Sequence, residues 1–288
     1  MHYADYKTIL SPKNGMNLYR GCTHGCIYCD SRSACYQMDH DFEDIEVKRN
    51  AQLILEEQLK RRRKPCMIGT GAMCDPYIPL EGELQVTRQC LELIEKYGFG
   101  VSILTKSNLI LRDLDILKSI NAKTKCVVQV TLTTYDEELC KKIEPRVAST
   151  QERFHVLEVM RDEGIPTVVW LCPTLPFIND TEENLRGLLD YCLAAQVKGI
   201  LCFGFGMTLR EGDREYYYAK LDELFPGLKE KYIQTFGNVY SCQSPNNTLL
   251  MDILRETCIQ NSLLFHTDEV FSYLNEFDSK QQQMSLFD

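Results

Sequence analysis

The sequence predicts an α/β fold in which about six strand–helix units form an open barrel. First, short apolar runs alternate with amphipathic segments from residue 16 to residue 203, as in a parallel sheet with helices outside it. Second, six units are too few to close a barrel of eight. Third, the residues that can carry chemistry follow the predicted strands, and in such folds function is found at the carboxyl ends of the strands.

The strands are predicted from short apolar runs bounded by glycine or polar residues, a pattern typical of buried strands. They lie at residues 16–20, 67–69, 101–104, 127–132, 167–171 and 199–203.

The helices are predicted from apolar residues that repeat at intervals of three and four. Within the barrel they lie at residues 48–63, 83–97, 109–120 and 151–163. A fifth helix follows Asp180 or Thr181, either of which is suited to cap it. After residue 203 the alternation stops, and residues 214–224 and 249–260 are predicted to be helical.

The chain is accordingly divided into four parts. We expect an N-terminal extension over residues 1–15, the barrel over 16–210 and a C-terminal extension packed on the barrel over 211–277. Residues 278–288 are polar, which predicts a flexible, disordered tail. A length of 288 residues suits one large domain with a small appendage.

Composition predicts a soluble, cytoplasmic protein. No run of 18 or more apolar residues appears, so no membrane-spanning helix or membrane partner is expected. The first residues lack the basic-then-apolar order of a signal peptide. The formal net charge of -9 weighs against nucleic acid as a partner, although it leaves room for a local basic groove.

Fourteen cysteines occur without an export signal, so a disulfide framework is not expected. Most are scattered singly and are expected to pack as small hydrophobic residues, among them Cys90, Cys126, Cys192 and Cys202.

One group of cysteines is different. Cys22, Cys26 and Cys29 have the spacing C-x3-C-x2-C, which places three thiolates on one tight loop. A structural zinc site takes four ligands, and no second closely spaced pair of cysteines supplies the fourth. His24 lies inside the loop, where reaching the same metal would be strained. An electron-transfer cluster also takes four cysteines, and Cys35 is near enough in sequence to be considered.

Three ligands without a fourth predict a [4Fe–4S] cluster with one open iron. The amino and carboxylate groups of S-adenosylmethionine can chelate such an iron, which places the sulfonium beside the cluster. Transfer of an electron then releases a 5'-deoxyadenosyl radical, in keeping with the open positions of catalytic metals generally. Gly21 and Gly25 let the backbone wrap closely around the cluster.

These residues resemble the radical SAM superfamily, and the cysteine triplet carries that resemblance. Within the superfamily, the chain looks like the spore photoproduct lyase-like branch, or DNA repair photolyase-related proteins, from about residue 16 to residue 275. The branch resemblance rests on the motifs Tyr19-Arg20-Gly21-Cys22, Cys29-Asp30-Ser31-Arg32-Ser33, Asp75-Pro76-Tyr77, Leu104-Thr105-Lys106, Glu144-Pro145-Arg146 and Pro173-Thr174-Leu175-Pro176-Phe177-Ile178-Asn179-Asp180.

The resemblance implies a partial (β/α)6 TIM-like barrel with a [4Fe–4S] cluster and S-adenosylmethionine as cofactors. It also implies that Tyr28 borders the adenine, that Lys106 holds the methionyl carboxylate and that Thr131 lies where the lyase has a ribose-contacting serine. Each has a structural alternative: core packing for Tyr28, an exposed strand end for Lys106, and β-branching in a strand for Thr131.

The same resemblance gives Cys74 a catalytic role. The lyase uses a cysteine after its second strand to return a hydrogen atom to a thymine radical, and Cys74 follows the second predicted strand. The alternative is a small buried residue in a loop. The lyase also has a tyrosine directly after its third cysteine, whereas this chain has Asp30 there, as uncharacterised relatives do.

Three functions are compatible with these features. The leading hypothesis is a lyase-like radical SAM enzyme that acts on a nucleic-acid lesion or modified base in DNA repair. The second is the same chemistry on a small molecule, peptide or protein, which the net negative charge favours. The third is a non-enzymatic iron–sulfur redox protein, which a fourth cysteine ligand would favour. A radical SAM enzyme takes electrons from a reducing donor, here expected to be of the flavodoxin or ferredoxin type.

The tail adds a candidate partner. The five residues from Gln283 to Phe287 resemble the peptide by which bacterial repair and replication proteins bind the sliding clamp. A glutamine followed by aliphatic and aromatic anchors suits a groove-binding peptide. Coincidence is the alternative for so short a motif.

Overall fold

Six parallel strands form the central sheet of the computed structural model, which describes residues 1–280. In spatial order they are β2 (Gly15–Met16), β5 (Met67–Thr70), β6 (Gly100–Thr105), β7 (Cys126–Thr131), β8 (Thr167–Trp170) and β9 (Gly199–Leu201). Within the described residues the edge strands β2 and β9 do not pair with each other, so the barrel is open, as predicted.

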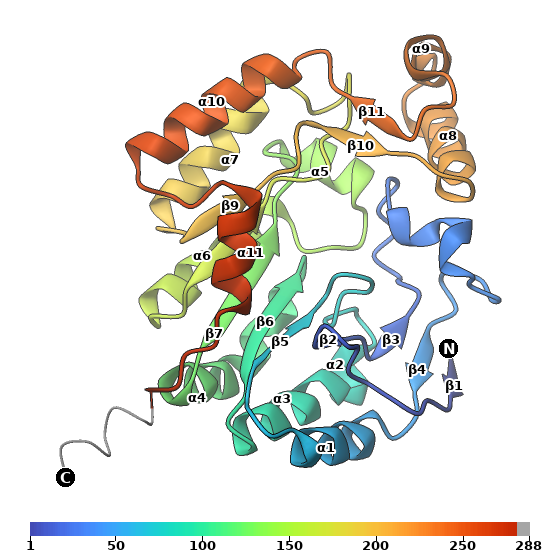
Figure 1. Cartoon of the computed structure of the whole chain (residues 1–288). Helices are drawn as coiled ribbons and strands as arrows, with labels where there is room; N and C mark the ends of the chain where they lie inside the picture. The colour runs from blue at the N-terminus through green and yellow to red at the C-terminus, as the bar shows by residue number, and fades with distance from the viewer. Residues whose placement is uncertain (281–288) are drawn as a thin grey trace.

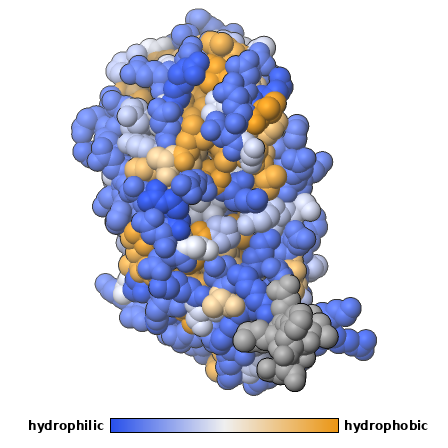
Figure 2. All heavy atoms as spheres, turned by 90° about the vertical axis from the view of Figure 1, so that its left-hand side faces the viewer, coloured by the Kyte–Doolittle hydropathy of each residue, from blue (hydrophilic) through white to orange (hydrophobic). Residues whose placement is uncertain are grey.

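Helices cover the outer face of this sheet (Figure 1). They are α1 (Ala51–Arg61), α3 (Val86–Lys96), α4 (Leu114–Lys123), α6 (Thr150–Asp162), α7 (Glu182–Ala194) and α10 (Asn247–Gln260). Strand residues such as Ile103, Val128 and Val169 are fully buried against them. Figure 2 shows one outer side of the molecule as largely hydrophilic, with apolar side chains gathered in its upper half.

The helix predicted over residues 83–97 is interrupted. A short helix α2 (Glu81–Leu84) ends at Gln85, whose φ of 54° is left-handed, and α3 begins at the next residue. The buried Glu81 carboxylate explains the break, because its Oε2 accepts a hydrogen bond from the Thr87 amide at 3.0 Å and so takes the place of a cap for α3. The helix predicted over 109–120 likewise begins as a 3-10 helix, Asn108–Asp113.

The first predicted strand, residues 16–20, belongs to two sheets. Its beginning is β2, whereas β3 (Tyr19–Arg20) pairs antiparallel with β4 (Glu46–Lys48). Strand β1 (His2–Ala4) pairs in parallel with the other edge of β4. Strands of two or three residues are too short to show a period in the sequence, so this small sheet was not predicted.

The concave face of the sheet is filled near the amino ends of its strands. Helix α11 (Thr267–Asn275) lies against this face, where Val270 and Leu274 pack on Met67, Val127 and Val168. Helix α11 therefore closes the barrel at the amino ends of the strands. The open space of the barrel lies at the carboxyl ends.

Besides the central sheet and the small sheet of β1, β4 and β3, a third unit lies next to the loop that carries the three cysteines. It comprises β10 (Gly206–Thr208), α8 (Asp213–Leu224), α9 (Leu228–Phe236) and β11 (Ser241–Gln243), and α5 (Glu137–Ile143) packs next to it. Strand β10 precedes the predicted domain boundary at residue 210 and pairs with β11, which follows it. Residues 281–288, most of the predicted tail, lie outside the described residues. Among those that are described, no helix is long and apolar enough to cross a membrane.

Candidate active site

A cavity of about 600 Å³ opens at the carboxyl ends of the strands. The cysteine loop forms one wall, and the ends of β5, β6, β7 and β8 form the base, as expected for a barrel of this kind. All seven site residues predicted from the sequence line this cavity: Cys22, Cys26, Cys29, Tyr28, Cys74, Lys106 and Thr131.

The cysteine loop is held tightly at its start. Gly21 has a φ of +84°, and a Cβ there would lie 2.5 Å from the carbonyl oxygen of Phe42. The same oxygen accepts a hydrogen bond from the Cys22 amide at 3.0 Å. A side chain at residue 21 would therefore push the loop away from the segment on which Cys22 rests.

The thiols fit an iron–sulfur cluster better than a single ion. Within residues 1–280, the sulfurs of Cys22, Cys26 and Cys29 are not all within 4.8 Å of one another, as ligands of one zinc ion would be. Burial, followed by the neighbouring Cys26, raises the pKa of Cys22, and burial raises the pKa of Cys26 to about 12 although the charge of Lys106 opposes the rise. Three thiolates in this wall therefore need a cationic group between them, which a larger cluster supplies.

The two other residues considered as ligands lie differently. The Cys35 thiol is exposed, does not line the cavity and accepts a hydrogen bond from Arg210 at 3.3 Å. His24 lines the cavity, but its Nδ1 faces Asp75 Oδ2 at 3.6 Å, and burial lowers its pKa. Neither arrangement supplies a fourth protein ligand.

A buried charge network supports the cysteine wall from behind. The Lys106 ammonium donates to the Tyr28 hydroxyl at 2.9 Å and lies 3.5 Å from Glu144 Oε1. Tyr28 donates in turn to Glu144. Arg153 completes the network through an ion pair with Glu144 at 2.6 Å and a 2.8 Å hydrogen bond to the carbonyl of Thr131. This network links three predicted site residues.

Electrostatics keep these groups charged. Burial alone would raise the pKa of Glu144, but Arg153 and Lys106 outweigh it and lower the pKa to about 2. Burial opposes the charge of Lys106 as well, yet Cys26, Tyr28 and Glu144 raise its pKa well above the ordinary value. The cavity therefore presents a fixed cation beside the cysteines.

Asp75 organises the base of the cavity and was not predicted as a site residue. Its carboxylate accepts hydrogen bonds from the Thr105 hydroxyl at 2.7 Å, the Lys106 amide at 2.7 Å and the Tyr77 amide at 2.8 Å. It thereby ties the loop after β5 to the end of β6 and places Lys106. The sequence signal was its position after a strand, within Asp75-Pro76-Tyr77.

Cys74 is buried with its thiol directed toward the cysteine loop. Its Sγ donates to the carbonyl of Gly21 at 2.9 Å. Burial, then the nearby Cys22 and Asp75, raises the pKa of this thiol well above its usual value, so the sulfur keeps its proton.

A second wall of the cavity is aromatic, and the sequence did not reveal it. Trp170 lines the cavity at the end of β8 and donates from Nε1 to Gln129 at 2.7 Å. Phe203 lies across from it with ring centroids 5.9 Å apart and is 60% exposed. Phe271 of α11 packs against both rings. Only their placement after strands could have indicated these residues.

Asp30, which follows the third cysteine, also lines the cavity. It accepts a hydrogen bond from the Tyr36 hydroxyl at 2.8 Å and lies 3.3 Å from Arg210. A tyrosine hydroxyl is thus present near this position, but it comes from Tyr36.

Fold and site together define a radical SAM enzyme. The sequence matches the radical SAM superfamily over residues 16–190, and the chain belongs to this superfamily. An uncharacterized protein of Mycobacterium tuberculosis (strain ATCC 25618 / H37Rv) is 31% identical over 229 residues, 77% of this chain. The chain spans 66% of that relative's length, just under two thirds.

Two further comparisons concern the fold and the chemistry. Spore photoproduct lyase complexed with dinucleoside spore photoproduct shares the fold, with a TM-score of 0.62 and 14% identity over 86% of this chain and 75% of the lyase. A radical SAM Nalpha-GlyT isomerase of Pseudomonas phage M6 is 24% identical over 169 residues, 59% of this chain and 34% of the isomerase.

Members of the superfamily use a [4Fe–4S] cluster and S-adenosylmethionine and need a reductant. The donor set of this cavity, three thiols with a neighbouring cation, fits both groups. The non-enzymatic redox alternative is not supported, because the superfamily is one of enzymes.

Proposed function

We propose that this enzyme acts on a lesion or modified base of nucleic acid in a lyase-like reaction. One observation carries the proposal: a single cavity joins the three cluster cysteines, the Cys74 thiol and the aromatic pair Trp170 and Phe203. The fold shared with spore photoproduct lyase, which is complexed with dinucleoside spore photoproduct, supports this substrate class. Lyase specificity and a role in DNA repair are part of the proposal.

When bound, the reduced cluster supplies the electron that cleaves S-adenosylmethionine to methionine and a 5'-deoxyadenosyl radical. Lys106 is assigned to the methionyl carboxylate, because its ammonium is a largely buried cation 3.8 Å from Cys26 Sγ. Tyr28, held by Lys106 and Glu144, would border the adenine, and Thr131 would contact the ribose. Cys22, Cys26 and Cys29 hold the cluster.

Cys74 is assigned as the hydrogen-atom donor. Its thiol is protonated and fixed by the hydrogen bond to Gly21. In the transfer, the S–H bond breaks and a C–H bond forms on the substrate radical, which leaves one unpaired electron on sulfur. A hydrogen atom from 5'-deoxyadenosine, or an electron from the reductant with a proton, restores the thiol.

The aromatic wall suits a nucleobase. Stacking of a base on an aromatic side chain contributes about 1–3 kcal/mol, and a base turned out of its stack enters a cavity of this kind. Because the net charge is -9, recognition rests on the base more than on the phosphates.

The second candidate is the same chemistry on a small molecule or peptide. The acidic net charge favours it, since such substrates need no phosphate contacts. A flavodoxin- or ferredoxin-type donor serves either candidate. The proposed clamp peptide, from Gln283 to Phe287, lies outside the described residues.

The test uses cluster-loaded protein under anaerobic conditions with S-adenosylmethionine, dithionite and dinucleoside spore photoproduct or an irradiated oligonucleotide. We expect loss of the lesion by mass spectrometry and no change in the unirradiated oligonucleotide. If 5'-deoxyadenosine forms but no nucleobase probe is consumed, the nucleic-acid proposal fails and the second candidate replaces it.

A substitution tests the assignment of Cys74 as the hydrogen-atom donor. Cys74→Ala is expected to retain iron and 5'-deoxyadenosine formation but to alter the product of the substrate radical. Cys66→Ala, a half-buried thiol that does not line the cavity, serves as the matched control and is expected to give the parent product. Identical products from Cys74→Ala and the parent would remove the assignment.

A further inference from the structure

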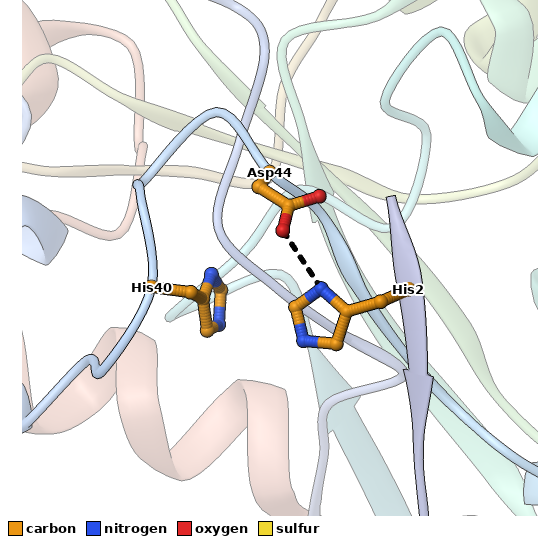
Figure 3. A group of neighbouring side chains, drawn as sticks. All are labelled: His2, His40 and Asp44. Carbon is orange, nitrogen blue, oxygen red and sulfur yellow. Dashed lines mark hydrogen bonds and ion pairs between the residues drawn. The ribbon is translucent and has the colours of Figure 1, made fainter.

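Two histidines and two carboxylates meet at the N-terminal edge of the small sheet, outside the lining of the cavity. Strand register places His2 beside Glu46, because the two are partners in the β1–β4 pair. The segment that leads into β4 adds His40 and Asp44. Ligand atoms of His2, His40 and Asp44 all lie within 4.8 Å of one another, and Figure 3 shows the three side chains converging.

The His40 ring is oriented as a metal ligand would be. Its Nδ1 lies 3.0 Å from the carbonyl oxygen of Asp41, which can only accept a hydrogen bond, so Nδ1 carries the proton. Its Nε2 then has a free lone pair. This nitrogen is buried and has no hydrogen-bond partner among residues 1–280. A buried acceptor without a partner is costly, and a bound cation removes that cost.

The His2 ring faces two carboxylates, one at each ring nitrogen. Its Nδ1 lies 2.9 Å from Asp44 Oδ2, a contact drawn in Figure 3, and its Nε2 is 3.7 Å from Glu46 Oε2. Because Asp44 is one of the proposed ligands, an ion bound between its Oδ2 and His2 Nδ1 would take the place of this hydrogen bond, and Glu46 would face the other ring nitrogen.

Glu46 stands between the two rings. Its Oε2 lies 3.7 Å from His2 Nε2 and 4.0 Å from His40 Nε2, too far for hydrogen bonds. Glu46 is not one of the residues whose ligand atoms all lie within 4.8 Å of one another, so it stands beside the group of His2, His40 and Asp44. The other Glu46 oxygen accepts from the Tyr6 hydroxyl. Asp44 Oδ1 lies 2.8 Å from the amino group of Met1, which leaves Oδ2 for the site.

We propose that His2, His40 and Asp44, with Glu46 beside them, bind a divalent transition-metal ion, with zinc as the best match. Imidazole together with carboxylate suits zinc, whereas calcium and magnesium prefer oxygen ligands throughout. The His2 and Asp44 side chains are 40% and 42% exposed, so the ion has access from solvent. This second metal site is separate from the cluster and does not depend on the proposed function.

The metal would support the cysteine loop. Two of its ligands, His40 and Asp44, flank Phe42, whose carbonyl accepts the Cys22 amide at 3.0 Å. Glu43 in the same segment pairs with Arg32, which stacks on the Phe42 ring at 4.2 Å. Fixing both ends of this short segment restrains the backbone on which Cys22 rests.

Zinc content is the first test. Cluster-loaded protein that starts at Met1 and carries no histidine tag is dialysed against chelator-buffered zinc, and metals are measured by mass spectrometry. We expect one zinc per chain in addition to the iron. His40→Gln and the more exposed His2→Gln are expected to bind zinc at least tenfold more weakly. His155→Gln, a variant of an exposed histidine on α6, is the matched control and is expected to bind like the parent.

No zinc in the parent, or equal zinc in the parent and both variants, would overturn the site. Zinc-edge X-ray absorption separates it from adventitious binding to cysteines: nitrogen and oxygen neighbours with imidazole scattering support the proposal, and sulfur neighbours contradict it. Hydrogen exchange at the Cys22 amide tests the supporting role. Zinc should slow this exchange in the parent and His155→Gln but not in His40→Gln, and equal exchange with and without zinc would contradict that role.

Discussion

The two walls of the cavity differ in how completely their groups are already partnered. On the cysteine side, Lys106, Glu144 and Arg153 form a buried network in which each charge has an opposite charge nearby. On the other side, Phe203 is 60% exposed and offers an apolar ring. The paired charges hold the network in one conformation before a ligand binds. An exposed ring, by contrast, can pack against different apolar or aromatic groups. Cofactor recognition is thus built into the fold, and substrate recognition depends on few side chains.

The largest effect is expected on the cysteine wall. Cys26→Ala should lose the cluster and all 5'-deoxyadenosine formation, because two thiolates do not replace three. Iron analysis and the visible absorption of the cluster measure this loss. Cys35→Ala, which changes an exposed thiol outside the cavity, should keep both. Iron retained at the parent level in Cys26→Ala would contradict the assignment.

The second largest effect is expected in the charge network behind the cysteine wall, on the free energy of unfolding. Glu144→Gln leaves Arg153 buried without its counter-charge, which costs about 3–5 kcal/mol of unfolding free energy. Urea unfolding at pH 7 measures it, and Glu138→Gln on the exposed side of α5 is the control. The double variant Glu144→Gln/Arg153→Met should lose less than the sum of the single variants. Additive losses would show that the pair is not coupled.

The same carboxylate predicts a pH dependence. Arg153 and Lys106 overcome the effect of burial and hold the pKa of Glu144 at about 2, below its ordinary 4.5. A depressed pKa stabilises the fold fully above about pH 4.5, and this contribution of about 3 kcal/mol is lost as the pH falls toward 2. Urea unfolding of the parent and Glu144→Gln should therefore show a smaller difference at pH 3 than at pH 5. A constant difference would contradict this origin of the stability.

A smaller effect is expected from Lys106, the cation of the cysteine wall that lines the cavity. Lys106→Met should retain the cluster but bind S-adenosylmethionine about tenfold to a hundredfold more weakly, since a charged hydrogen bond contributes about 1.5–3 kcal/mol. Equilibrium binding to cluster-loaded protein measures this change. Lys141→Met, on the surface of α5, should bind like the parent. Unchanged affinity in Lys106→Met would remove the carboxylate assignment.

The smallest effect is expected on the aromatic wall. Phe203→Ala removes one exposed ring, which should raise the KM for a nucleobase substrate roughly fivefold, about 1 kcal/mol, and leave S-adenosylmethionine binding unchanged. Ile259→Ala, an exposed apolar residue on α10, is the control. A loss of S-adenosylmethionine binding in Phe203→Ala would show that the two walls are not separate.

Features that depend on local sequence could be predicted, whereas features that depend on contacts between distant residues could not. Strands β5 to β9 and the gathering of Cys74, Lys106 and Thr131 in one cavity follow from local periodicity and from the position of residues after strands. The break at Gln85 does not, because it depends on a buried carboxylate whose partners fold around it.

Contacts between segments far apart in the chain could not be predicted from the sequence either. The Glu144–Arg153 pair meets Tyr28 and Lys106 only after α5 and α6 pack, and α11 reaches the barrel from the far end of the chain. The motif Glu144-Pro145-Arg146 carries part of the family resemblance, but nothing local to it indicates a buried ion pair.

Cleavage of S-adenosylmethionine in this cavity is the property on which every assignment above depends. The direct measurement is 5'-deoxyadenosine and methionine formed by anaerobic, cluster-loaded protein with S-adenosylmethionine and dithionite, without a further substrate. We predict both products in equal amounts from the parent and neither from Cys26→Ala. Protein with a full complement of iron that forms neither product would contradict the account.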